Sequence, residues 1–188
     1  MSEIMRSALP GAEFTGFVQV SEAGLQGMIT LRADLAAPQL ATALKSATGC
    51  AMPKTRKITR DGAHSLVWMS PDELMILCPH AEAPALTDRL SREMAGAFVT
   101  LANVSDARAM FRVTGAMWRD ALAKLCPVDF ASLQTGDIRR TRAAQVAAAI
   151  LVTDAQEAQI ICFRSVAGYM FDLLSIAAAP GAEPALYV

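Results

Sequence analysis

The order of predicted strands and helices constrains the fold of this chain more than any other feature of its sequence. In the first half, apolar patterns predict the order β-α-β-β-α-β. The second half repeats the plan as β-α-β-β-α, and "VSDARAMF" passes from one half to the other without a clear linker. Two split βαβ (ferredoxin-like) halves are the most economical arrangement of these elements, so we expect an α+β fold.

Three parts of the chain follow from this plan. Residues 1–27 contain glycine, proline and small polar residues, which predicts an irregular tail with at most a short strand at "GFVQV". Residues 28–104 form the first half. Residues 105–188 form the second half, which we expect to share one core with the first.

Individual segments support these elements. In residues 64–79, "LVWM" and "LMILC" are separated by "SPDE", which predicts a hairpin, whereas "KTRKITR" before them reads as a loop. A helix is expected from about Asp34 to Gly49. Ala109, Phe111 and Val113 alternate with Arg108, Met110, Arg112 and Thr114, as in a half-buried strand. "VAGYMFDLLSIAA" has the spacing of a helix.

Composition excludes several classes of protein. Hydrophobic residues make up 53% and charged residues 19% of the 188 residues, as in a globular chain with a large core. The net charge of −1 argues against binding to nucleic acid or to an anionic membrane. We find no apolar run of membrane-spanning or signal-peptide length, so we expect a cytoplasmic protein. A mean hydropathy of +0.32 suits a subunit that buries one face against a partner, and equally a compact core.

No metal site is expected. The sequence has no C-x-x-C motif, and four scattered cysteines are predicted to be buried thiols that pack as small hydrophobes: Cys50, Cys78, Cys126 and Cys162. His64 and His80 lack the spacing and the companions of a metal pair.

Candidate acids and nucleophiles have simpler structural interpretations. Ser105-Asp106 suggests a nucleophile, but the second half has no histidine, which favours a turn before the next strand. Asp72-Glu73 is a pair of carboxylates that we expect on a solvated turn. The sequence also has no phosphate-binding glycine motif.

The arginines are the best chemical signal in the sequence. Arg108 and Arg112 share a strand face, and Arg139, Arg140 and Arg142 precede another strand. Arginine pairs well with carboxylates and phosphates, so these residues suit a subunit interface or, less readily, an anionic ligand. They could also face solvent or pair with nearby acids, namely Asp106, Asp120 and Asp137.

The second half resembles the aminomethyltransferase (glycine cleavage T-protein) family and its folate-binding relatives. The resemblance rests on Val113-Thr114-Gly115, Pro127-Val128-Asp129 and Leu133-Gln134-Thr135-Gly136. "WMSPDELMILCP", "CPVDF", "GDIRRTRAAQVAAAILV" and "FRSVAGYMFDLL" are similar to the gamma subunits of heterotetrameric sarcosine oxidases. The similarity covers most of residues 25–178 and implies a T-protein-like, folate-binding-type domain.

The resemblance also implies that chemistry has been lost. Catalytic relatives carry a carboxylate beside the folate, in the strand that here reads Gln145-Val146-Ala147-Ala148-Ala149. Ala144-Gln145 replaces their Gly-Gly pair, and the next acid along the strand is Asp154. An alanine methyl group cannot accept a proton. We therefore expect no catalytic, cofactor-binding or metal-binding residue in this chain.

By resemblance, the chain is a scaffold subunit of a complex that oxidatively demethylates sarcosine to glycine. Its partners would be the alpha, beta and delta subunits, and FAD, FMN, NAD, tetrahydrofolate and zinc would be bound by those partners. A free-standing folate-binding or aminomethyltransferase-like protein is the alternative, and a regulatory module of a different dehydrogenase complex is a third possibility.

Overall fold

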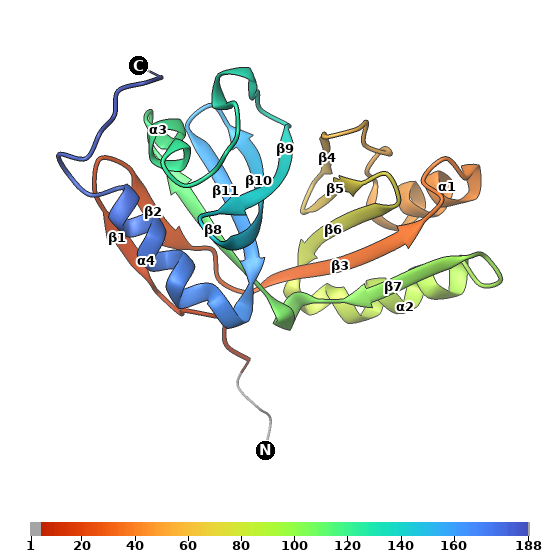
Figure 1. Cartoon of the computed structure of the whole chain (residues 1–188). Helices are drawn as coiled ribbons and strands as arrows, with labels where there is room; N and C mark the ends of the chain where they lie inside the picture. The colour runs from red at the N-terminus through yellow and green to blue at the C-terminus, as the bar shows by residue number, and fades with distance from the viewer. Residues whose placement is uncertain (1–4, 188) are drawn as a thin grey trace. The chain divides into compact units, whose positions relative to one another are not determined.

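The computed structural model describes residues 5–187, which divide into two compact units (Figure 1). The central unit comprises Leu25–Ser105. The terminal unit combines the residues up to Gly24 with those from Asp106 onward. Within residues 5–187, no helix is both long and apolar enough to cross a membrane.

The central unit has a five-stranded antiparallel sheet in the order β4-β5-β6-β3-β7. Its strands are β3 (Gln26–Ala33), β4 (Ile58–Asp61), β5 (His64–Ser70), β6 (Glu73–Pro79) and β7 (Val99–Asn103). Two helices, α1 (Pro38–Thr48) and α2 (Ala83–Glu93), supply apolar side chains to the core. Leu40, Leu44 and Leu90 belong to the same buried cluster as alternate residues of β3 and β6.

The terminal unit has a six-stranded antiparallel sheet in the order β1-β2-β8-β11-β10-β9. Its strands are β1 (Glu13–Thr15), β2 (Gln19–Glu22), β8 (Arg108–Thr114), β9 (Ile138–Ala143), β10 (Val146–Asp154) and β11 (Glu157–Phe163). Its helices are α3 (Trp118–Ala123) and α4 (Ala167–Ala177). Trp118, Phe130 and Phe111 are its largest buried side chains.

The same four-strand order occurs in both sheets. The central unit contains β5-β6-β3-β7, and the terminal unit contains β10-β11-β8-β2. Strand β2 therefore takes the place beside β8 that β7 takes beside β3. This confirms the α+β class with split βαβ halves, and it corrects the prediction of an irregular tail, because residues 13–15 and 19–22 form strands. That the two halves share one core stays a prediction.

Local signals fix most element ends. Helix α1 ends as predicted at Gly49, whose φ of 75° suits glycine and whose N–H donates to the Lys45 carbonyl at 2.9 Å. The helix begins at Pro38 rather than near Asp34, because proline is favoured at a first helical position. The loop predicted over "KTRKITR" is wrong for residues 58–60, which pair with β5 as part of strand β4.

Candidate functional site

The β9–β10 hairpin contains the three arginines singled out in the sequence. It also contains the alanines that, by resemblance, stand where catalytic relatives carry a carboxylate. Ala143 pairs with Val146, so Ala144 and Gln145 form a two-residue turn. Ala144 has a φ of 49°, a conformation for which glycine is preferred. Its N–H donates to the Leu125 carbonyl at 2.8 Å, and this bond holds the turn in place.

The three arginines of β9 do not lie together. Arg139 is opposite Ile150, a member of the core cluster, so it lies on the core face of the sheet. Its guanidinium donates to the Ile138 carbonyl at 2.8 Å. Arg140 and Arg142 are opposite Ala149 and Ala147 and lie on the other face, where both arginines are exposed. We call this second face of the sheet the arginine face.

Arg108 and Arg112 also lie on the arginine face, because Ala109, Phe111 and Val113 between and beside them join the core cluster. The guanidinium carbon of Arg108 lies 3.9 Å from the Phe163 ring centroid, a cation–π contact. Strands β8 and β9 are separated by β11 and β10. At about 4.8 Å per strand, the two arginine pairs start about 14 Å apart in the sheet. Because strands β8 and β9 are this far apart, the four guanidinium groups cannot all contact one small anion.

Strand β10 presents no carboxylate to the arginine face before its end. Ala147, Ala149 and Leu151 project there, and Asp154 accepts a hydrogen bond from the Gln156 N–H in the following turn. An acid that the sequence reasoning missed does lie near: Glu157 opens the neighbouring strand β11. Its carboxylate accepts from Thr153 Oγ1 at 2.7 Å and from Gln159 Nε2 at 3.2 Å.

Two buried acids of the terminal unit hold local structure. Asp137 is buried and accepts from the Gln134 N–H at 3.0 Å, which closes the turn before β9. Asp120 is fully buried on α3, and its Oδ1 accepts from the Leu186 N–H at 2.6 Å. Its Oδ2 has no hydrogen-bond partner among residues 5–187. Neither carboxylate lies on the arginine face.

Ser105 lies in a turn before the next strand, as expected. The hydroxyl donates to Asn103 Oδ1 at 2.6 Å and accepts from the Met28 N–H at 2.9 Å. Ser105 and Asp106 lie in the short 3₁₀ helix η2 (Ser105–Ala107) that leads into β8. The hydroxyl is therefore engaged in fixing the end of β7.

Asp72 and Glu73 form a fork with one arginine. Arg32 donates to Asp72 at 3.3 Å and to Glu73 at 2.9 Å. Asp72 is exposed as expected, but Glu73 is buried, because it begins strand β6 opposite Arg32. Both carboxylates therefore share one guanidinium as their partner, which is an ion-pair arrangement within the central unit.

The histidines and cysteines also have structural surroundings. His64 lies 3.1 Å from a Glu82 carboxylate oxygen, and His80 opens the short 3₁₀ helix η1 (His80–Glu82). Residues 5–187 contain no group of three or more His, Cys, Asp or Glu arranged to hold a metal ion. All four cysteines are free and buried, which confirms the prediction of packed thiols.

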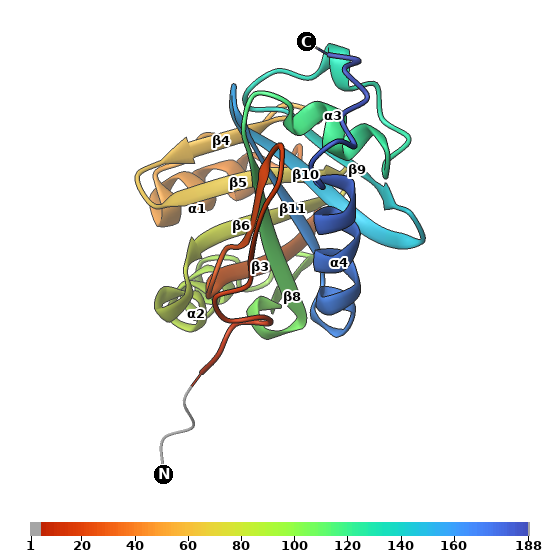
Figure 2. The same ribbon diagram turned by 90° about the vertical axis from the view of Figure 1, so that its left-hand side faces the viewer.

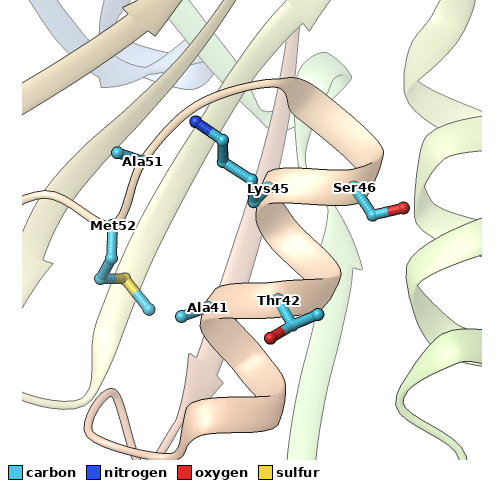
Figure 3. Close-up of a pocket in the computed structure, with 6 residues that line it drawn as sticks. All are labelled: Ala41, Thr42, Lys45, Ser46, Ala51 and Met52. Atoms are coloured by element: carbon cyan, nitrogen blue, oxygen red, sulfur yellow. The ribbon is translucent and has the colours of Figure 1, made fainter.

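Two open pockets occur in the central unit. The first, of about 550 Å³, lies between α1 and the segment that follows it (Figure 3). The Lys45 ammonium is its only charged group, and the other side chains are small or apolar: Ala41, Thr42, Ser46, Ala51 and Met52. A second pocket of about 770 Å³ includes Met52, Trp68, Asp34 and Arg56. In the first pocket, Ser46 Oγ accepts a hydrogen bond from the Arg89 guanidinium at 2.9 Å.

Comparison with known families and structures is consistent with this geometry. The model of the family described as "Sarcosine oxidase, gamma subunit family" matches residues 32–180. A chain of heterotetrameric sarcosine oxidase from Corynebacterium sp. U-96, in complex with pyrrole 2-carboxylate, superposes with a TM-score of 0.79 and 23% identity. The match covers 88% of this chain and 87% of that one. No curated protein gave a significant match.

The fold is also that of an aminomethyltransferase. The glycine cleavage system aminomethyltransferase T from Bartonella henselae superposes with a TM-score of 0.62 and 12% identity. The match covers 82% of this chain but only 44% of that protein. The expected T-protein-like fold is thus confirmed at the level of the fold, while function depends on the residues present.

Proposed function

Because the chain belongs to the sarcosine oxidase gamma subunit family, we propose that it is a structural subunit of a heterotetrameric sarcosine oxidase and performs no chemistry itself. In this proposal the complex oxidatively demethylates sarcosine to glycine, releases hydrogen peroxide and passes the one-carbon unit to tetrahydrofolate. The present chain contributes surfaces on which its partner subunits assemble.

The side chains of β10 carry this proposal. One-carbon transfer on a bound folate needs a carboxylate that can exchange a proton or stabilise positive charge. In the strand to which the resemblance assigns that carboxylate, this chain has Ala147 and Ala149 on the arginine face. Alanine side chains cannot exchange a proton, so we assign no step of the one-carbon transfer to this chain.

The same reasoning assigns the reactive groups to other subunits. We propose that FAD, FMN, NAD, tetrahydrofolate and zinc are bound by the alpha, beta and delta subunits. The polar groups of the present chain support this division, because Ser105, Asp137 and Glu73 are all engaged in bonds that fix its own fold.

Co-expression with and without this chain tests the assembly role. We expect partner subunits expressed with the affinity-tagged chain to be recovered together in a yellow, flavin-containing eluate. Partners expressed without it should yield much less complex on size-exclusion chromatography. An intact complex in normal yield without this chain would contradict the proposal.

A folate-binding protein is the alternative, favoured by the shared fold with an aminomethyltransferase. It predicts that the isolated chain binds tetrahydrofolate, which isothermal titration calorimetry would detect. Saturable binding to a chain that recovers no partner would replace the structural proposal with this alternative.

A further inference from the structure

Helices α2 and α4 occupy the same place in the two units. Each has eleven residues and follows a three-residue 3₁₀ helix, η1 (His80–Glu82) or η4 (Arg164–Val166). Each comes after a seven-residue strand that begins with glutamate, β6 at Glu73 and β11 at Glu157. Every residue of α2 therefore corresponds to the residue 84 positions later in α4.

The inward faces of the two helices agree. Leu86 corresponds to Met170 and Leu90 to Leu174, and all four side chains are buried in the core of their unit. Ala83 and Ala167, at the first helical positions, are buried as well. The fold thus makes the same demand on this side of both helices.

The outward faces differ. In α2, Arg89 and Arg92 point to solvent, and Arg89 also pairs with Glu93 at 2.8 Å. The corresponding positions of α4 hold Leu173 and Ile176. Ile176 is 72% exposed and Tyr169, one turn before Leu173, is 48% exposed. Residues 169, 173 and 176 share one side of a helix, so they form a continuous apolar stripe.

Among residues 5–24 and 106–187, no element of the terminal unit covers Tyr169 and Ile176 of this stripe. Figures 1 and 2 show α4 on the outside of its unit, with the sheet on its inner side only. A helix that is apolar on both sides is normally buried on both sides. Because α2 meets the same fold requirement with arginines, the fold itself does not explain the apolar side chains of α4.

Asp172 indicates what kind of surface the stripe meets. Asp172 is exposed beside the stripe. It is the only charged residue in the α4 sequence AGYMFDLLSIA. A second copy packed against α4 about a two-fold axis would bring two such carboxylates together without a cation from either helix. Membrane-surface helices carry lysine or arginine, and α4 has neither.

We infer that the outward face of α4 is the docking surface for a partner subunit of the oxidase, which presents an apolar patch and a lysine or arginine opposite Asp172. This inference rests on the proposed function and assigns it a surface. Tyr169 and Ile176 are the central contacts, because aromatic and large aliphatic side chains supply most of the energy of such interfaces.

The test replaces the α4 face by the α2 face in the tagged chain co-expressed with its partners. Ile176→Arg installs the residue that α2 has at the equivalent position, and Asp172→Lys reverses the only charge. We expect each variant to recover partner subunits at least about tenfold less efficiently. Both sites are exposed, so the thermal midpoint of the isolated chain should stay unchanged.

Matched controls lie on α2. Asp88→Lys and Arg92→Ile change the corresponding exposed positions and should leave partner recovery at the wild-type level. Wild-type recovery by Ile176→Arg and Asp172→Lys would overturn the inference while leaving the subunit proposal intact. Loss of a homodimer of the isolated chain in these variants would overturn it in favour of a second copy. If the wild-type chain recovers no partner at all, the proposed function itself has failed.

Discussion

At the scale of single residues, the four cysteines show how burial decides chemistry. Burial raises the pKa of the Cys126 thiol to about 12 and that of Cys78 and Cys162 to about 11. A thiolate is the reactive form of cysteine, so these side chains are inert in the native protein at neutral pH. The sequence predicted this from spacing alone, because no cysteine had a companion suited to metal or redox chemistry.

These raised pKa values predict how stability depends on pH. A folded-state pKa above the unfolded value of 9.0 means that the thiol contribution is complete below that pH and is lost as pH rises toward the folded value. We expect the free energy of unfolding to fall above about pH 9, by up to about 1.4 kcal/mol per pH unit for each thiol.

Urea unfolding between about pH 8 and about pH 10 measures this slope. The variant Cys126→Ala removes one titrating group and serves as the control, because its stability should decline less steeply across the same interval. Equal slopes for wild type and variant would show that Cys126 does not contribute.

At the scale of elements, the β9–β10 hairpin shows what sequence reasoning could and could not reach. The arginines and alanines were identified, but the sequence "DIRRTRAAQVAAAILV" is compatible both with one long strand and with two short ones. The choice depends on the turn at Ala144, an alanine with a positive φ that no local pattern indicates. The pairing that this turn sets places Arg139 on the core face, and Arg140 and Arg142 on the other face.

The strained turn gives a prediction about stability. Ala144→Gly should stabilise the chain by about 0.5–1 kcal/mol, because glycine adopts a positive φ without the cost borne by alanine. Ala147→Gly, two residues after the turn within β10, should destabilise by a similar amount. Thermal unfolding compares the two variants, and a destabilised Ala144→Gly would mean that strain at the turn is negligible.

Helix α4 illustrates a different limit. Its helical spacing was predicted correctly from periodicity, and Met170 and Leu174 of the predicted apolar side are buried. The same spacing placed Tyr169 and Leu173 on that apolar side, which is wrong for Tyr169 because its side chain is exposed. Only the folded structure shows that the side chains of Tyr169 and Ile176 are exposed.

At the scale of the whole molecule, the sequence predicted that the second half repeats the plan of the first. It did not predict which strand completes the sheet of the second half. The sequence showed that the second half lacks a final strand. It did not show that β2, from a segment rich in glycine, fills that place beside β8. Such a pairing joins residues far apart in the chain, and short-range patterns carry no information about it.

Our central claim also concerns the whole molecule. We propose that this chain is a subunit of a sarcosine oxidase complex and takes no part in its reaction. Glu157 lies beside β10 on the arginine face, so it is the acid best placed to act as a general acid or base. The most direct measurement follows, per flavin, both sarcosine-dependent peroxide formation and transfer of the one-carbon unit to tetrahydrofolate by the intact complex containing Glu157→Gln. We predict turnover within about twofold of wild type, whereas loss of a general acid or base would lower it by about 10²-fold or more. A fall of that size in a complex of normal composition would contradict the account.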